Sequence, residues 1–109
     1  MKTKIYEVDS VQVTVTSVNG HIRVDSNGKV NTSGWSDSAL VDTPRPPSDG
    51  RHHLDFVAEP PTGIVLQVIT PIAAGPRSLQ AGAGRFCVVV HSATNEIEQC
   101  VDVQIGDPK

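Results

Sequence analysis

The sequence predicts an all-β fold, a single-domain antiparallel β-sandwich of about seven to eight strands that is immunoglobulin-like in the broad architectural sense. Three observations lead to this prediction. Apolar and polar residues alternate in several segments, which is the two-residue period of a half-buried strand. Turn-forming Asn, Asp, Gly and Pro residues separate these segments. No segment shows the 3.6-residue period and end caps of a helix.

The length and charge of the chain limit what it can be. A chain of 109 residues fits one domain, residues 1–109, and folding removes roughly 65% of the unfolded surface from water, which is enough for one core. The net charge is -3, the basic residues are scattered and only 4% of residues are aromatic. The chain therefore lacks the basic stripe and stacking platforms that nucleic acids require, and we expect no nucleic-acid partner.

The sequence also bears on membranes and compartment. No apolar run approaches the roughly 20 residues that span a bilayer, and Met1 to Ser10 has no apolar signal-peptide region. We expect no membrane partner. A cytoplasmic location follows if Met1 is the native start, whereas prior removal of a signal peptide would make the protein extracytoplasmic, so the compartment stays open.

The first elements are a short edge strand at Lys4 to Val8 and then a strand with valine at every second position from 11 to 15. Asn19-Gly20 predicts a tight hairpin turn, because both residues tolerate positive φ. Folding about this turn pairs Val15 with Val24. The face expected to be buried contains Val11, Val13, Val15, Ile22 and Val24.

The next segment, Ser26 to Ser38, is polar and small, with Asn27-Gly28 as a second turn signal. It predicts a turn, an irregular crossing and a short strand from Trp35 to Val41. Trp35 is the only tryptophan. It is interpreted first as a plug of the core and second as a half-exposed anchor at a binding surface, where tryptophan is enriched.

Asp42 to Gly50 reads DTPRPPSDG and predicts a stiff surface loop, because its prolines remove backbone donors and Asp49-Gly50 closes a turn. Pro44 to Pro47 has the PxxP spacing of polyproline ligands. A plain connection between sheets is the simpler interpretation.

Alternation returns at His53 to Glu59, with Leu54, Phe56 and Ala58 predicted inward. After Pro60 to Gly63, a strand at Ile64 to Thr70 is expected to place Leu66 in the core. Ala73 to Gly84 is rich in Gly and Ala, so it predicts an exposed loop.

The clearest hairpin joins Phe86 to His91 and Glu96 to Ile105 through a four-residue loop, Ser92 to Asn95. This register places Cys87 opposite Cys100, with Cα atoms about 4.5 to 5.5 Å apart, within the range of a disulfide. The bond is expected in an oxidising compartment and two thiols in cytosol. The predicted core face contains Phe86, Val88, Val90, Ile97, Val101 and Val103, with Gln99 as a polar exception, and the outer face contains His91, Glu96, Glu98 and both cysteines.

Candidate chemistry is sparse. We expect no catalytic residues and no cofactor, because no nucleophile, base and orienting group are brought together and no glycine loop opens a helix. His53 and Asp55 share a strand face and are weak candidates for a metal site. His21 or His91 could complete a non-local site, although His91 and Glu96 are more simply an exposed cross-strand pair.

The sequence favours a non-enzymatic binding or interaction module, in which a rigid sandwich presents Pro- and Gly-rich loops. Its partner is expected to be another protein or a second copy. One alternative is a structural domain that forms homo-oligomers through sheet edges, and another is a small metal-dependent or hydrolytic enzyme. Ala73 to Gly84 is one candidate loop, and the individual binding-loop candidates are Pro44, Arg45, Pro46, Pro47, Pro60, Pro61, Thr62 and Gly63.

Overall fold

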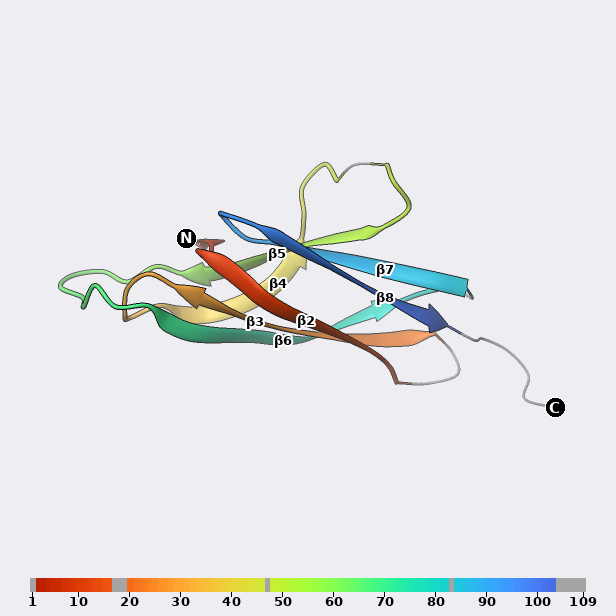
Figure 1. The fold of residues 1–109 in the computed structure, drawn as a ribbon, viewed down its shortest axis with the longest axis horizontal. Coiled ribbons are helices and arrows are strands. Elements are labelled where there is room, and N and C mark those ends of the chain that lie inside the picture. The colour runs from red at the N-terminus through yellow and green to blue at the C-terminus, as the bar shows by residue number, and fades with distance from the viewer. Residues whose placement is uncertain (1, 17–19, 47, 83, 104–109) are drawn as a thin grey trace.

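The fold is a β-sandwich of two packed sheets, as the sequence predicts, in a computed structural model that describes residues 2–16, 20–46, 48–82 and 84–103 (Figure 1). It is elongated, with principal extents of 59 × 25 × 21 Å. The described residues contain no helix long and apolar enough to cross a membrane. The strands are β1 (Thr3–Lys4), β2 (Glu7–Val15), β3 (His21–Val30), β4 (Ser36–Asp42), β5 (His52–Glu59), β6 (Thr70–Gln80), β7 (Gly84–His91) and β8 (Glu96–Val103).

β5 is the centre of the larger sheet. It pairs along one edge with β4, and on its other edge with β7 at His52–Asp55 and with β1 at Val57 and Ala58. β8 completes this sheet by pairing with β7, and the second sheet has the order β2-β3-β6. All pairs are antiparallel except β5–β7, which is parallel. That parallel pair is the one departure from the expected antiparallel sandwich.

The hairpin of β7 and β8 has the predicted register. His91 faces Glu96, Val90 faces Ile97, Phe86 faces Val101 and Cys87 faces Cys100. The two cysteines form a disulfide, and their Cα atoms lie 4.0 Å apart, somewhat closer than expected. On the core face, the side chains of Val88, Val90 and Val103 are buried, while those of Phe86, Ile97 and Val101 are half-buried and pack against the core.

The hairpin of β2 and β3 has the predicted buried face but a different register. Val13 faces Val24 and Val15 faces Ile22, so the predicted pairing of Val15 with Val24 is wrong by two positions. The connection is longer than a two-residue turn, because the N–H of Thr16 donates to the carbonyl oxygen of His21 at 2.9 Å. Asn19, on which the predicted turn was centred, lies outside the described residues.

The N-terminal edge strand is shorter than predicted. β1 ends at Lys4 in the larger sheet and β2 begins at Glu7 in the smaller one. Ile5, between them, is fully buried, because the chain passes through the core as it changes sheets.

Asn27-Gly28 does not form the predicted turn, since β3 runs through it to Val30. The missing side chain of Gly28 allows residues 5 and 7 to pack closely against β3. A Cβ atom at Gly28 would overlap the carbonyl oxygen of Glu7 and the side chain of Ile5. Glycine in a strand interior is typical of such a close approach.

The segment from Ile64 to Gly84 corrects two predictions. Residues 60–69 form no strand, and Leu66 is exposed rather than buried. Most of the expected Ala73 to Gly84 loop is instead strand β6, which pairs with β3. Its prolines are tolerated because β6 is the last strand of its sheet, and Gly75 sits with φ +122 beside a register shift in the β3–β6 pair.

The core lies between the sheets, and Leu54, Phe56 and Ala58 point into it as predicted. Trp35 packs against this core while remaining half-buried, and its Nε1–H donates to Thr32 Oγ1 at 3.0 Å. Its position thus has features of both interpretations that the sequence allowed.

Side-chain contacts join β4 to β6 at one long side of the sandwich, and two of them reach backbone carbonyl groups. Arg77 Nη1 donates to the carbonyl oxygen of Leu40 at 3.0 Å, and Ser38 Oγ donates to that of Ala73. The two sheets are therefore connected along this side by side chains, without backbone pairing between β4 and β6.

Candidate functional site

The outer face of β5 is covered by the proline-rich connection between β4 and β5, residues 43–51, which stands above the sheet in Figure 1. β5 is therefore buried on both faces, and Val89 on the same outer face of β7 is fully buried. The alternation in the sequence predicts that this face is exposed, because a short-range pattern gives no information about a loop that covers it. Polar groups trapped beneath the loop must find partners there.

A chain of four titratable side chains, here called the histidine chain, runs beneath and beside this loop. It consists of Asp49, His53, His91 and Glu96. His53 Nε2 lies 3.0 and 3.1 Å from the two carboxylate oxygens of Asp49, and His53 Nδ1 lies 2.9 Å from His91 Nε2. His91 Nδ1 lies 3.2 Å from Glu96 Oε1, which confirms the predicted cross-strand pair.

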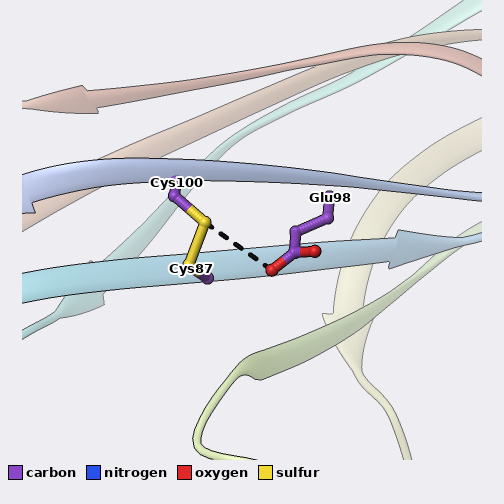
Figure 2. A group of neighbouring side chains, drawn as sticks. All are labelled: Cys87, Glu98 and Cys100. Atoms are coloured by element: carbon purple, nitrogen blue, oxygen red, sulfur yellow. Dashed lines mark hydrogen bonds between the residues drawn. A yellow bond between two sulfur atoms is a disulfide. The ribbon is translucent and has the colours of Figure 1, made fainter.

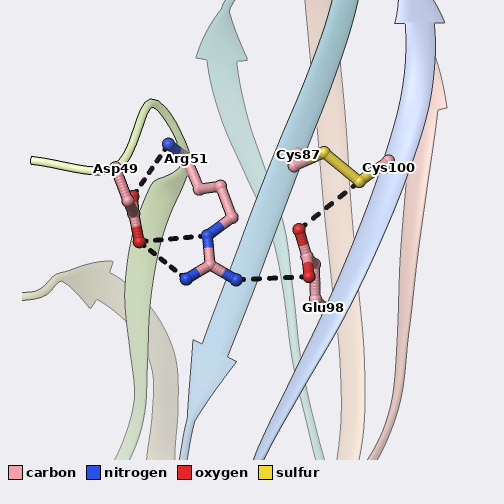
Figure 3. Close-up of a disulfide and its surroundings, with 5 residues drawn as sticks. All are labelled: Asp49, Arg51, Cys87, Glu98 and Cys100. Atoms are coloured by element: carbon pink, nitrogen blue, oxygen red, sulfur yellow. Dashed lines mark hydrogen bonds and ion pairs between the residues drawn. A yellow bond between two sulfur atoms is a disulfide. The ribbon is translucent and has the colours of Figure 1, made fainter. Parts of the chain in front are cut away.

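Arg51 holds the outer end of this chain. Its guanidinium donates to Asp49 Oδ2 from Nε at 3.0 Å and from Nη2 at 2.6 Å, and its backbone N–H donates to Asp49 Oδ1 (Figure 3). Nη1 of Arg51 also donates to Glu98 at 3.2 Å. The hydrogen bonds from Arg51, with one from His53, hold the pKa of Asp49 far below its usual range, and Asp49 in turn raises the pKa of Arg51.

The predicted metal candidates His53 and Asp55 do share this face, and each is engaged by a protein group. Asp55 Oδ1 accepts a hydrogen bond from Thr43 Oγ1 at 2.8 Å. The two ring nitrogens of His53 point to opposite partners, Asp49 and His91. His21 lies on β3 of the other sheet, opposite Gln80.

His52 points away from the histidine chain and pairs with a carboxylate on β4. Its Nε2 lies 3.2 Å from Asp42 Oδ1, which also accepts from Arg77 Nη2 at 3.1 Å. The hydrogen bond with His52 is the largest cause of a lowered pKa at Asp42, and the charge of Arg77 adds to it. This cluster links β4, β5 and β6.

The disulfide lies on the same outer face, next to Glu98 (Figure 2). Glu98 Oε2 is 3.6 Å from Cys100 Sγ. Both sulfur atoms form the disulfide bond, so neither carries a hydrogen that could be donated to Glu98. The three side chains are grouped closely enough to hold a metal ion, but thiolate ligands would first require reduction.

A second candidate region is the connection between β5 and β6, residues 60–69, here called the apolar loop. It extends past one end of the sandwich in Figure 1. Ile64 is fully exposed, Leu66 is 70% exposed, and the side chains of Val68 and Ile69 are about half exposed. Large apolar side chains gathered on an exposed surface commonly mark an interaction site.

The apolar loop is fastened at its middle. The N–H of Leu66 donates to Ser33 Oγ at 3.1 Å, and its carbonyl oxygen accepts from the N–H of Ser33 at 3.0 Å. Pro61 and Val65 are half-buried against Gly34, where an added Cβ would lie 2.9 Å from Pro61 and 3.3 Å from Val65. Val65 therefore faces inward while its two neighbours in sequence face solvent.

The residues of the predicted binding loops differ in their exposure. Pro44, Arg45 and Pro46 are exposed, and Pro47 lies outside the described residues. Thr62 and Gly63 are exposed, and Pro60 and Pro61 are half-buried. The segment 64–69, in which every residue except Val65 is exposed, was not predicted as a site, although the absence of charged residues from residue 60 to residue 76 is a signal for it in the sequence.

No protein-family model matches the chain, and no curated protein or solved structure is similar to it.

Proposed function

We propose that this protein is a non-enzymatic binding module that engages another protein through the apolar loop. The observation that supports the proposal is the exposure of Ile64, Leu66, Val68 and Ile69 on one continuous segment. Burying such side chains yields about 25 cal/mol per Å² of apolar surface. A partner that covers them gains a hydrophobic contact that the free protein leaves unused.

The way the loop is held favours binding. The loop begins with Pro60 and Pro61, Pro71 lies just beyond it, and Ser33 fixes the backbone of Leu66 by hydrogen bonds in both directions. A segment already ordered in its extended form loses less conformational entropy on association. Half-buried Trp35 follows directly in sequence on Ser33 and Gly34, which contact the loop, and aromatic residues often anchor interfaces.

The chemistry of the loop favours a protein over a membrane. Interfacial membrane binding normally combines apolar side chains with Lys and Arg that attract anionic lipids. The apolar loop has no basic residue, Glu59 precedes it, and the whole chain carries a net charge of -3. The partner surface is therefore expected to be concave and largely uncharged.

The sheet edges offer less to a partner than the loop does. Carboxylates at positions 96, 98 and 102 line β8, prolines interrupt β6, and register shifts interrupt β2 and β4. These are devices by which natural sheets avoid edge pairing.

A non-enzymatic role is supported by how the polar groups are engaged. The Thr43 hydroxyl donates to Asp55, the two cysteines are joined, and each ring nitrogen of His53 and His91 faces another side chain. A nucleophile needs a base within hydrogen-bond reach that is not committed elsewhere.

The proposal can be tested by placing a photo-crosslinking phenylalanine analogue at Ile64 in cells that make the protein. Thr14, exposed on β2, is the matched control position. A discrete crosslinked protein is expected from position 64 and not from position 14. The purified partner should then bind the wild type and lose affinity for the Ile64→Ser, Leu66→Ser variant by at least about tenfold, or about 1.4 kcal/mol.

Sedimentation of the isolated protein separates this role from self-assembly. A concentration-independent monomer is expected. A dimer that dissociates in the Ile64→Ser, Leu66→Ser variant would replace the foreign partner by a second copy, and unchanged affinity of that variant for the captured protein would refute the role of the loop.

A further inference from the structure

A carboxylate oxygen faces the Cys87–Cys100 disulfide with no donor hydrogen between them. Glu98 Oε2 lies 3.6 Å from Cys100 Sγ (Figure 2), and an ionised carboxylate only accepts hydrogen bonds. A thiol hydrogen or a metal ion would join the two atoms. Either one requires that the disulfide be reduced first.

The distance between this sulfur and this oxygen matches a tetrahedral zinc site. Zinc holds a thiolate sulfur at about 2.3 Å and a carboxylate oxygen at about 2.0 to 2.2 Å, so that a sulfur and an oxygen bound to the same ion lie about 3.6 Å apart. Cys100 Sγ and Glu98 Oε2 have that separation in the structure, 3.6 Å. Two thiolate sulfurs on one zinc ion lie about 3.8 Å apart by the same geometry.

The strands keep the two cysteines opposite each other whether or not their sulfur atoms are bonded. Cys87 pairs with Cys100 in a β7–β8 ladder that continues on both sides of the pair, and their Cα atoms lie 4.0 Å apart. Glu98 lies two residues before Cys100 on β8, so its side chain leaves from the same face. Both cysteines are half-buried and Glu98 is exposed, so a reductant and a metal ion have access to all three side chains.

Arg51 orients the carboxylate toward the sulfur. Its Nη1 donates to Glu98 Oε1 at 3.2 Å, which leaves Oε2 on the side of Cys100 (Figure 3). Asp49 holds the same guanidinium at 2.6 Å. Outer partners of this kind commonly fix the ligands of metal sites, and the charge of Arg51 offsets part of the negative charge that two thiolates and a carboxylate would bring together.

We propose that reduction of the disulfide creates a zinc site, in which Cys87, Cys100 and Glu98 are the ligands and water takes the fourth position. A dithiol reductant supplies two electrons and two protons: the bond between the two cysteines breaks, two thiols form, and the sulfur atoms of the reductant become a disulfide. Zinc then binds the two sulfurs as thiolates together with Glu98 Oε2, and the two thiol protons pass to solvent. Thiolate ligands favour zinc over magnesium and calcium.

The test is a calorimetric titration of zinc chloride into the reduced and the oxidised protein. The reductant is a phosphine, which takes an oxygen atom from water as the disulfide takes up two electrons, because a dithiol would itself compete for zinc. The reduced protein is expected to bind one zinc ion per chain. The oxidised protein keeps every histidine and carboxylate of the chain and is expected to bind zinc at least about a hundredfold more weakly, since the thiolate ligands are missing.

Variants on β8 identify the ligands. Glu98→Gln keeps the size of the side chain without its charge and should weaken zinc binding to the reduced protein by at least about tenfold. Glu96→Gln, on the same face of β8, is the matched control and should keep the wild-type affinity. With Co²⁺ in place of zinc, the reduced wild type should show sulfur-to-metal charge-transfer absorption, and Cys100→Ser should lack it.

Reduced protein that takes up no zinc, whether folded or not, would overturn the proposal. Equal affinity of the oxidised and the reduced protein would place the ion elsewhere, and an unchanged affinity of Glu98→Gln would remove the carboxylate from the site. The comparison of oxidised with reduced wild type decides even if Cys100→Ser does not fold.

Discussion

The two proline-containing connections that flank β5, residues 43–51 and 60–69, are similar in length and differ in what their side chains contact. The first folds down on the outer face of β5 and places its polar side chains against partners, including Asp49 against His53 and Thr43 against Asp55. The second runs past the end of the sandwich and turns Ile64 and Leu66 to solvent. Proline therefore stiffens both loops without deciding their role.

The difference teaches that side-chain chemistry separates a loop that completes the fold from one that serves recognition. A loop that carries Thr43, Asp49 and Arg51 finds partners on the sheet and adds to stability. A loop of uncharged aliphatic residues is attached through the backbone of Leu66 to Ser33 and through Pro61 and Val65 beside Gly34, and leaves its other aliphatic side chains in solvent. Substitutions of the partnered polar side chains in loop 43–51 should thus lower stability more than substitutions of the exposed side chains in the apolar loop.

The largest contrast is expected from a pair of threonines. Thr43→Val removes the donor to Asp55, a carboxylate that is only 7% exposed, and should lower the free energy of unfolding by about 1 to 3 kcal/mol. Thr62→Val, in the exposed part of the apolar loop, should change it by less than about 0.5 kcal/mol. Urea unfolding measures both, and equal losses would erase the distinction between the loops.

Acid should weaken loop 43–51 through Asp49. The pKa of this carboxyl is lowered in the folded protein, chiefly by hydrogen bonds from Arg51, so the folded state favours the ionised form. Its contribution to stability is therefore present above the ordinary pKa of about 4 and is lost as the pH falls below it toward the lower folded value.

The measurement is the free energy of unfolding at a series of pH values from about 7 to about 3. Asp49→Asn should be less stable than the wild type at neutral pH and should show a flatter decline in acid. Parallel curves for the two proteins would show that Asp49 does not contribute. The effect should be smaller than that of Thr43→Val, because Asp49 is exposed.

Replacing one proline in each loop sharpens the comparison further. Pro46→Ala should lower stability by about 0.4 to 1 kcal/mol through the greater freedom of the unfolded chain, since Pro46 is exposed. Pro61→Ala loses the same constraint together with packing against Gly34, so its thermal midpoint should fall further. A smaller fall for Pro61 than for Pro46 would contradict the packing of the apolar loop on residues 31–34.

The smallest stability change is expected from Ile64→Ser, which replaces a fully exposed side chain. The free energy of unfolding should stay within about 0.5 kcal/mol of the wild type, and this makes the variant suitable for binding experiments. A loss above about 2 kcal/mol would mean that Ile64 is buried in solution.

The sequence predicted best where partners are close along the chain. The β7–β8 register follows from a four-residue turn, because a slip of one residue would expose the buried valines. In β2 and β3 the alternation identified the buried face correctly, while Asn19-Gly20 misled the register by two positions. The buried face and the register of a hairpin are thus separate predictions. The alternation of apolar and polar residues predicts the face, and the length of the turn predicts the register.

The failures involve contacts that only the assembled fold creates. β6 contains Gly75 and two prolines, so its composition resembles a loop, and only its place at the edge of a sheet permits it to be a strand. The link between His53 and His91 depends on the parallel pairing of β5 with β7, for which no local pattern exists. For the same reason, the sequence predicted the His91–Glu96 contact, left a site joining His53 and His91 as an open possibility, and gave no indication of Asp49.

That parallel pair also has a consequence for the order in which the chain folds. The hairpins of β2–β3 and β7–β8 join neighbouring segments, and hairpins of this kind form within about 1 to 10 μs. β5 and β7 are separated in sequence by a segment that contains β6 of the other sheet, and such distant pairings are slow because loop-closure entropy must be overcome first. The meeting of His53 with His91 should therefore be a late event, so that their ring signals mark the arrival of the native state.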